Sequence, residues 1–111
     1  MSTIIYALKT CDSCKKAIKQ LSAAGHDLSV IDVRADGVPR EKLAEWLAAH
    51  GADVVVNKKS TTWRNLSDDE RAADPLDLLS AHPTLLKRPV IVSGETSHVG
   101  WGKDVQAHFG V

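Results

Sequence analysis

Cysteine is scarce in this sequence: only Cys11 and Cys14 are present, separated by two residues. A disulfide between residues this close would close too small a loop to stabilise a secreted mini-domain. A structural zinc site would need two further ligands, but the chain has no other cysteine and no second histidine three to five residues after His26. We therefore expect no metal site, and a reducing cytoplasmic setting in which the Cys-x-x-Cys step is either redox-active or incidental.

Long apolar runs and net charge are missing as well. The apolar run at residues 4–8 is too short for a signal peptide or a membrane span. Fourteen Lys and Arg residues balance fourteen Asp and Glu residues, which removes the long-range attraction typical of general nucleic-acid or membrane-surface binders. We expect neither a direct nucleic-acid partner nor a membrane. The 111 residues, 43% of them hydrophobic, are typical of one globular domain.

The first third of the chain has the pattern of a strand, a helix and a second strand. Residues 3–8 form a continuous apolar and β-branched run, typical of a strand covered on both faces. After Cys11 the apolar residues recur at helical spacing and a glycine follows as a stop: Cys14, Ala17, Ile18, Leu21 and Gly25. Residues 28–33 indicate the second strand, so we expect a βαβ unit with a right-handed crossover.

Helix signals dominate the middle of the chain. Pro39 fits the first turn of a helix ending near Gly51, Ser67 and Glu70 form a capping box, and Pro75 opens another helix. Residues 52–57 are ambiguous, because their valine run has the composition of a strand while its length and surroundings leave the assignment open.

The last part of the chain indicates two strands and a helix. Residues 89–92 and 96–100 are close enough for a hairpin, and residues 103–109 form a final helix. A βαβ unit followed by a helical middle and a ββα unit predicts an α/β, thioredoxin-like fold with a mixed four-stranded sheet and a helical insertion. We expect a single domain over residues 1–111, with a core of 1–35 and 86–111 and an insert of about 38–85.

Cys11 is the candidate nucleophile. It lies where the first strand gives way to the first helix, so unpaired N–H groups and the positive end of the helix dipole favour its thiolate. Lys9, Lys15 and Lys16 add positive charge, whereas Asp12 opposes it. Cys14 lies one turn further on. It is either a resolving thiol or a core residue of the helix, and the sequence leaves both roles open.

Two arginines downstream are candidate anion binders. When the substrate of a thiolate is an oxyanion, or glutathione with its carboxylates, arginine guanidinium groups near the sulfur can bind the negative charge. Arg64 follows Trp63, and Arg88 precedes Pro89 at the start of the third strand. In thioredoxin-like folds the residue before a cis-proline at this point faces the active thiol, so we expect a cis bond. The alternative is that both arginines are solvated surface charges and Trp63 is a packing aromatic.

Four segments resemble the arsenate-reductase-like (ArsC/Spx/YffB) family: residues 10–17 (TCDSCKKA), 60–66 (STTWRNL), 86–92 (LKRPVIV) and 99–102 (VGWG). The resemblance covers essentially the whole chain, in the correct order. It implies a thioredoxin-like sheet with a helical insert, and it implies that Cys11 is the nucleophile. Thr61 to Arg64 is most similar to the YffB branch, whereas the Cys-x-x-Cys step is similar to Spx.

Two departures from the arsenate reductases count against arsenate as the substrate. Arg64 and Arg88 match two of the three arginines that the resemblance implies, but the third position has Trp101, with Lys103 nearby as a partial substitute. The approach to the cysteine is residues 8–10 (LKT) rather than a histidine-rich segment.

The resemblance to the YffB branch implies a cytoplasmic thiol-dependent oxidoreductase with glutathione as co-substrate and no bound cofactor. Cys11 would attack, and Lys9, Thr10, Arg64 and Arg88 would bind the anionic part of the substrate beside Pro89. Glutathione or another small thiol is the expected partner, with glutaredoxin or thioredoxin as further candidates. The alternatives are an arsenate reductase and an Spx-like redox-sensing transcription regulator that binds RNA polymerase through its α-subunit.

Overall fold

The computed structural model describes residues 2–8, 10–94 and 96–111. Its backbone divides into two compact units, one of residues 1–35 with 88–111 and one of residues 36–87. We call them the sheet unit and the helical unit and describe each by itself. That the chain folds as a single domain stays a prediction.

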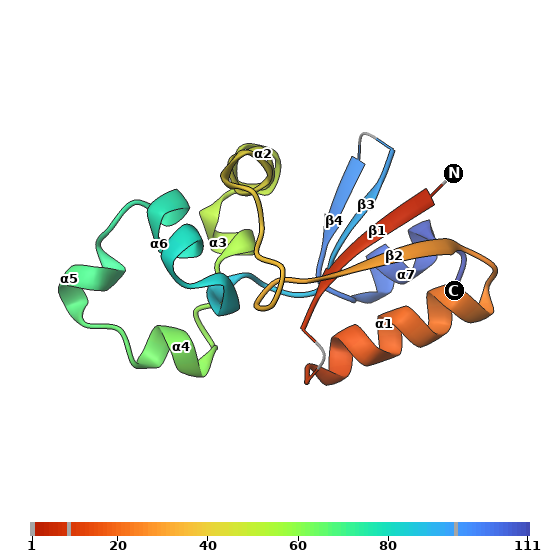
Figure 1. Cartoon of the computed structure of the whole chain (residues 1–111), viewed down its shortest axis with the longest axis horizontal. Coiled ribbons are helices and arrows are strands. Elements are labelled where there is room, and N and C mark those ends of the chain that lie inside the picture. Colours follow the sequence, from red (N-terminus) through yellow and green to blue (C-terminus); the bar gives the residue numbers. More distant parts are fainter. Residues whose placement is uncertain (1, 9, 95) are drawn as a thin grey trace. The chain divides into compact units, whose positions relative to one another are not determined.

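The sheet unit contains the predicted mixed four-stranded sheet (Figure 1). Its strands are β1 (Ser2–Ala7), β2 (Asp27–Asp32), β3 (Val90–Ser93) and β4 (Thr96–Val99), in the order β2-β1-β3-β4. β1 pairs with β2 in parallel, whereas β1 with β3 and β3 with β4 are antiparallel. Two helices, α1 (Asp12–Ala23) and α7 (Lys103–His108), belong to the same unit. The fold is the α/β, thioredoxin-like fold that the sequence predicts.

The strand pairing brings three chain segments to one edge of the sheet. The register aligns Ala7 with Asp32 at the carboxyl ends of β1 and β2, and Tyr6 with Val90 at the start of β3. Beyond the end of β2, the Val33 N–H still donates to the Ala7 carbonyl at 2.9 Å. The segments after β1, after β2 and before β3 therefore lie side by side.

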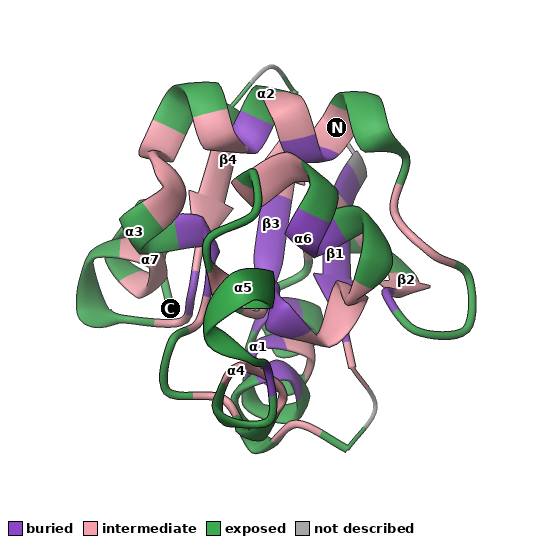
Figure 2. Ribbon diagram, turned by 90° about the vertical axis from the view of Figure 1, so that its left-hand side faces the viewer, coloured by how far each residue is buried: buried purple, intermediate pink, exposed green. Residues whose placement is uncertain are grey.

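The core of the sheet unit lies between the central strands and the two helices. β1 and β3 carry most of the buried positions of the sheet (Figure 2). The predicted apolar stripe of α1 packs against them, since the core cluster joins β1, α1, β3 and the end of α7: Ile5, Ala7, Cys14, Ala17, Leu21, Ile91 and Phe109. Helical periodicity therefore identified the buried face of α1 correctly.

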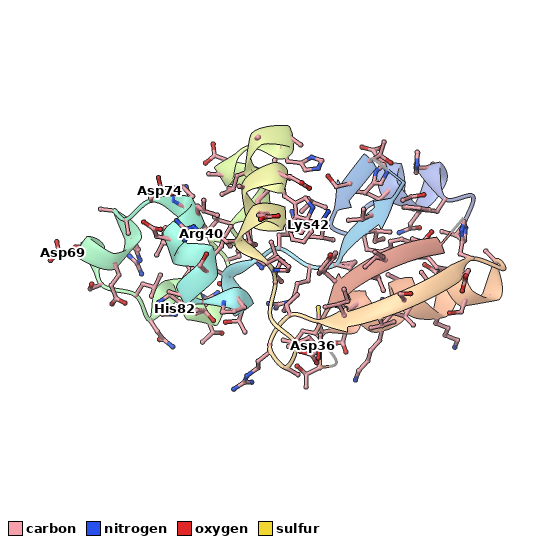
Figure 3. The ribbon with its side chains drawn as sticks, turned by 45° about the horizontal axis from the view of Figure 1, so that its top comes forward. Asp36, Arg40, Lys42, Asp69, Asp74 and His82 are labelled. Carbon is pink, nitrogen blue, oxygen red and sulfur yellow. The ribbon has the colours of Figure 1, made fainter. Side chains whose placement is uncertain are left out.

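The helical unit consists of short helices. They are α2 (Arg40–His50), α3 (Ala52–Val55), α4 (Thr61–Arg64), α5 (Asp68–Arg71), α6 (Pro75–Ala81) and the 3₁₀ helix η1 (Pro83–Leu85). Ser67 and Glu70 form the predicted capping box at the start of α5. Arg40, labelled in Figure 3, lies at the start of α2. It pairs with Asp77 of α6 and donates to the Ser80 hydroxyl at 3.2 Å. Among the described residues, no helix is both long and apolar enough to cross a membrane.

The ambiguous segment at 52–57 is a helical turn and not a strand. The N–H groups of Val55 and Val56 donate back to Gly51 and Ala52, which closes the turn of α3. Only Val56 forms an isolated bridge, to Leu86. Local hydrogen bonds thus form the turn, and only its end pairs as a strand would: the Lys87 N–H donates to the Val55 carbonyl and the Asn57 N–H donates to the Leu85 carbonyl, both at 2.8 Å.

Replacing Ile91 by alanine should lower the free energy of unfolding by about 2–5 kcal/mol, because Ile91 is fully buried between the sheet and its helices. Val30→Ala is the matched control, since Val30 lies on edge strand β2 and is 47% exposed. Its cost should stay within about 1 kcal/mol. Urea unfolding followed by far-UV circular dichroism measures both, and equal losses in the two variants would contradict the burial pattern.

Candidate functional site

Cys11 is held at the start of α1 by backbone hydrogen bonds on both sides. Its N–H donates to the Leu8 carbonyl at 2.9 Å, and its own carbonyl accepts from the Lys15 N–H at 3.0 Å. With φ −86° and ψ 121° it is the N-cap residue, extended and just outside the helix. The half-buried thiol therefore lies beside the N–H groups of the first helical turn, which have no partner within the helix.

The surroundings of Cys11 favour its thiolate. Partial burial raises the pKa of the Cys11 thiol, but hydrogen bonds from the backbone and the thiol of Cys14, the positive charge of Arg88 and the Ser13 backbone outweigh that burial. The net pKa is below the ordinary value of a cysteine. Because the thiolate is the attacking form, Cys11 has the electrostatic character of a nucleophile.

Cys14 has the opposite character. Its side chain is 0% exposed and belongs to the core cluster of the sheet unit. Burial, together with the negative charge of a Cys11 thiolate, raises the pKa of Cys14 to about 11, although the Leu8 backbone and Arg88 lower it in part. Near neutral pH Cys14 is therefore a protonated thiol that can donate to Cys11. A resolving role for Cys14 stays a prediction.

Arg88 and Pro89 lie before β3, at the same edge of the sheet as Cys11. The Arg88–Pro89 peptide bond is cis, the isomer expected from the sequence. Pro89 is fully buried, and its carbonyl accepts from the Gly100 N–H at 2.8 Å, where Gly100 has a φ of +86° that favours glycine. The Arg88 charge acts on both thiols. Cys11, Cys14 and Arg88 are thus brought together in the sheet unit.

The other predicted anion binders are placed differently. Thr10 is exposed directly before Cys11, and Lys9 lies outside the described residues. Arg64 ends α4 in the helical unit, where it is exposed and donates to the Lys59 carbonyl at 3.4 Å. An approach of Arg64 to Cys11 therefore stays a prediction.

The position that the resemblance assigns to a third arginine is a packing position. Trp101 packs against the core cluster, and its indole N–H donates to the Gln20 side chain of α1 at 2.8 Å. Lys103, the nearby substitute, is exposed in the first turn of α7. Trp101 thus contributes packing and a neutral hydrogen bond, not a positive charge.

A pocket that the sequence analysis missed includes Thr10, the residue before Cys11. It has a volume of about 380 Å³ and is lined by Leu8, Thr10, Asp32, Arg34 and Ala35. Asp32 closes the turn after β2, since its Oδ1 accepts the N–H groups of Arg34 at 2.8 Å and Ala35 at 2.9 Å. The sequence signal that could have revealed this pocket is a pair of charged residues, Asp32 at the end of β2 and Arg34 just after it. Within the described residues, no group of three or more His, Cys, Asp or Glu side chains could hold a metal ion.

Known proteins are similar in sequence to this chain over nearly its full length. The model of the ArsC family matches residues 6–109. An uncharacterized protein of Haemophilus influenzae is 39% identical over 112 residues, covering 95% of this chain and 96% of that protein. The global transcriptional regulator Spx of Lactiplantibacillus plantarum is 24% identical over 111 residues, covering 96% of this chain and 84% of Spx.

Two solved structures share the fold and a third of the sequence. A protein called YffB superimposes with a TM-score of 0.90 and 33% identity, over 96% of this chain and 97% of YffB. An arsenate reductase (ArsC) related protein from Brucella melitensis has a TM-score of 0.76 and 33% identity, over 100% of this chain and 97% of its own. On sequence and on structure alike, the chain belongs to the ArsC family.

Proposed function

We propose that this chain is a cytoplasmic thiol-dependent oxidoreductase that uses Cys11 as its nucleophile and glutathione as its co-substrate. One observation carries the proposal: a half-exposed thiol at a helix N-terminus has a pKa lowered by a neighbouring thiol donor and by Arg88. Such a thiol is poised for thiol–disulfide exchange. The two free thiols also fit a reducing compartment.

The proposed reaction is the reduction of a mixed disulfide between a substrate thiol and glutathione. The Cys11 thiolate attacks the glutathione sulfur, so a bond forms between the two sulfurs and the substrate leaves as a thiolate that takes a proton. A second glutathione thiolate then attacks the sulfur of the bound glutathione. Cys11 is released as a thiolate and glutathione disulfide forms. The sulfur of the second glutathione is oxidised and the substrate sulfur is reduced, while the sulfur of the first glutathione remains at the disulfide level throughout.

The neighbouring residues support this exchange in separate ways. The Cys14 thiol donates to the Cys11 thiolate, a role that its burial favours over that of a resolving thiol. Arg88 supplies positive charge, and Pro89 shapes the cleft. Lys9, Thr10 and Arg64 remain proposed binders of the anionic part of the substrate. Small thiols are the proposed partners, with glutaredoxin or thioredoxin as further electron donors.

Two other functions belong to relatives of this chain. Arsenate reduction is suggested by the name of the Brucella melitensis protein, but Trp101 replaces a cation that an arsenate site would use. Transcriptional regulation is the function in the name of Spx. A pull-down with the carboxyl-terminal domain of the RNA polymerase α-subunit, in oxidised and reduced forms, tests the second; capture in either state would favour a regulator.

Incubation with oxidised glutathione should attach one glutathione to the wild-type protein at Cys11, because Cys11 has the lowered pKa and is the less buried of the two cysteines. Intact-mass analysis should find the adduct in Cys14→Ser and not in Cys11→Ser. An adduct that persists in Cys11→Ser and disappears in Cys14→Ser would reverse the two roles.

The alkylation rate of Cys11 by iodoacetamide should rise with pH and level off above its pKa, with a midpoint below the ordinary thiol value of about 8.5. Cys14→Ala removes the thiol donor and Arg88→Gln removes the charge, so both should move the midpoint to higher pH. Lys19→Gln on the exposed face of α1 is the matched control for the loss of a positive charge, and it should leave the midpoint of the alkylation rate unchanged. A wild-type midpoint at the ordinary value would remove the basis of the proposal.

Arsenate should not be reduced by the purified protein with glutathione and glutaredoxin at more than the rate of Cys11→Ser, because Trp101 provides no charge for the oxyanion. Arsenite formation measured over time gives the answer. Turnover that is abolished in Cys11→Ser would make this chain an arsenate reductase.

A further inference from the structure

The pocket beside Cys11 has the position and the size of a ligand site. Its lining residues follow the carboxyl ends of the parallel strands β1 and β2 (Figure 1), which is where open α/β sheets bind their ligands. Its volume of about 380 Å³ falls within the range of roughly 300–1,000 Å³ that small-molecule sites occupy. Thr10 lines it and directly precedes Cys11, and adjacent α-carbons are about 3.8 Å apart. Cys11 itself does not line the pocket, so a molecule held there would extend past Thr10 to exchange with the Cys11 sulfur.

The walls of the pocket carry both signs of charge. Arg34 contributes an exposed guanidinium, for which the described residues supply neither an ion pair nor a side-chain hydrogen bond. Asp32 contributes a carboxylate two residues away. Leu8 and Ala35 provide apolar surface, and the Thr10 hydroxyl provides a neutral polar group.

Backbone hydrogen bonds fix the chain positions from which both charged side chains extend. The hydrogen bond from Val33 to Ala7 fixes the end of β2 against the end of β1. The Asp32 carboxylate then holds the N–H groups of Arg34 and Ala35, so the turn that carries the guanidinium is fixed as well. The site is thus preorganised on the carbonyl ends of two hydrogen-bonded strands.

An α-amino acid matches this arrangement, because it carries a carboxylate and an ammonium on one carbon. Arg pairs well with carboxylates through its planar fork, and a carboxylate attracts an ammonium. We propose that this pocket binds the α-amino-acid end of the small thiol that exchanges with Cys11, with its carboxylate on Arg34 and its ammonium facing Asp32. The proposal rests on the proposed function of Cys11 and adds to it the part of the thiol that is recognised.

The test measures adduct formation at Cys11 against the concentration of two disulfides. Oxidised glutathione carries α-amino-acid ends, whereas hydroxyethyl disulfide is neutral and reports the intrinsic reactivity of Cys11. Arg34→Gln should raise the half-saturating concentration of oxidised glutathione about five- to tenfold and leave the reaction with hydroxyethyl disulfide unchanged. Lys19→Gln removes one positive charge from the exposed face of α1. It should change neither the half-saturating concentration of oxidised glutathione nor the reaction with hydroxyethyl disulfide.

Asp32→Asn provides the sharper measurement. The asparagine oxygen can still accept the two N–H groups of the turn, so the backbone is kept while the negative charge is lost. Oxidised glutathione has a net negative charge, so general electrostatics predicts tighter binding to Asp32→Asn. Recognition of the ammonium predicts weaker binding, by about threefold or more, with Asp27→Asn on the exposed start of β2 as the control.

The outcomes separate the two proposals. Weaker binding of oxidised glutathione by both Arg34→Gln and Asp32→Asn supports the pocket. The pocket proposal is wrong if the adduct at Cys11 forms at a rate that does not depend on Arg34. It is also wrong if the adduct forms more readily in Asp32→Asn. In both cases the proposed function of Cys11 still stands. If neither disulfide forms an adduct at Cys11, the proposed function fails and the pocket proposal fails with it.

Discussion

The position of β1 between β2 and β3 is the constraint on which the rest of the sheet unit depends. Parallel pairing on one side and antiparallel pairing on the other bring together the end of β1, the end of β2 and the start of β3. Each of these three segments supplies a different chemical group: a thiol from Cys11, a charged pair from Asp32 and Arg34, and a guanidinium from Arg88. A shift of one residue in the register would turn the buried strand side chains to the other face of the sheet, and the groups that adjoin the strand ends would lose their positions.

The two cysteines differ because the same helix places them in different surroundings. Cys11 caps α1 and faces the first-turn N–H groups, whereas Cys14 lies one turn later on the face that packs against Ile5 and Ile91. Burial disfavours a charge on either sulfur, but only Cys11 receives enough hydrogen bonds and positive charge to overcome it. The protonated Cys14 then becomes a donor to its neighbour. One geometric difference thus shifts the pKa values of two identical side chains in opposite directions.

Local sequence patterns predicted most of the sheet unit and the start of α5, because helical spacing, strand composition and a capping box are all local signals. They also located Cys11 at the junction of strand and helix. The valine run ending at Val56 was ambiguous, since its composition favours a strand. Its N–H groups close a helical turn, and only its end pairs with a distant segment, at Leu86. Arg34 escaped notice for a different reason: its relation to Cys11 depends on which strand neighbours β1, and spacing along the chain does not contain that information.

A modest lowering of the Cys11 pKa suits exchange better than a large one. The thiolate fraction at neutral pH rises as the pKa falls, but the intrinsic nucleophilicity of the sulfur falls too, so the best attacking thiol has a pKa near the ambient pH. Partial burial of Cys11 opposes the hydrogen bonds and the Arg88 charge, so the pKa of the thiol falls less than those groups alone would lower it. The same positive surroundings stabilise a departing thiolate. Burial by itself would raise the pKa of the Cys11 thiol and keep it protonated. In this site it limits how far the neighbouring groups lower that pKa.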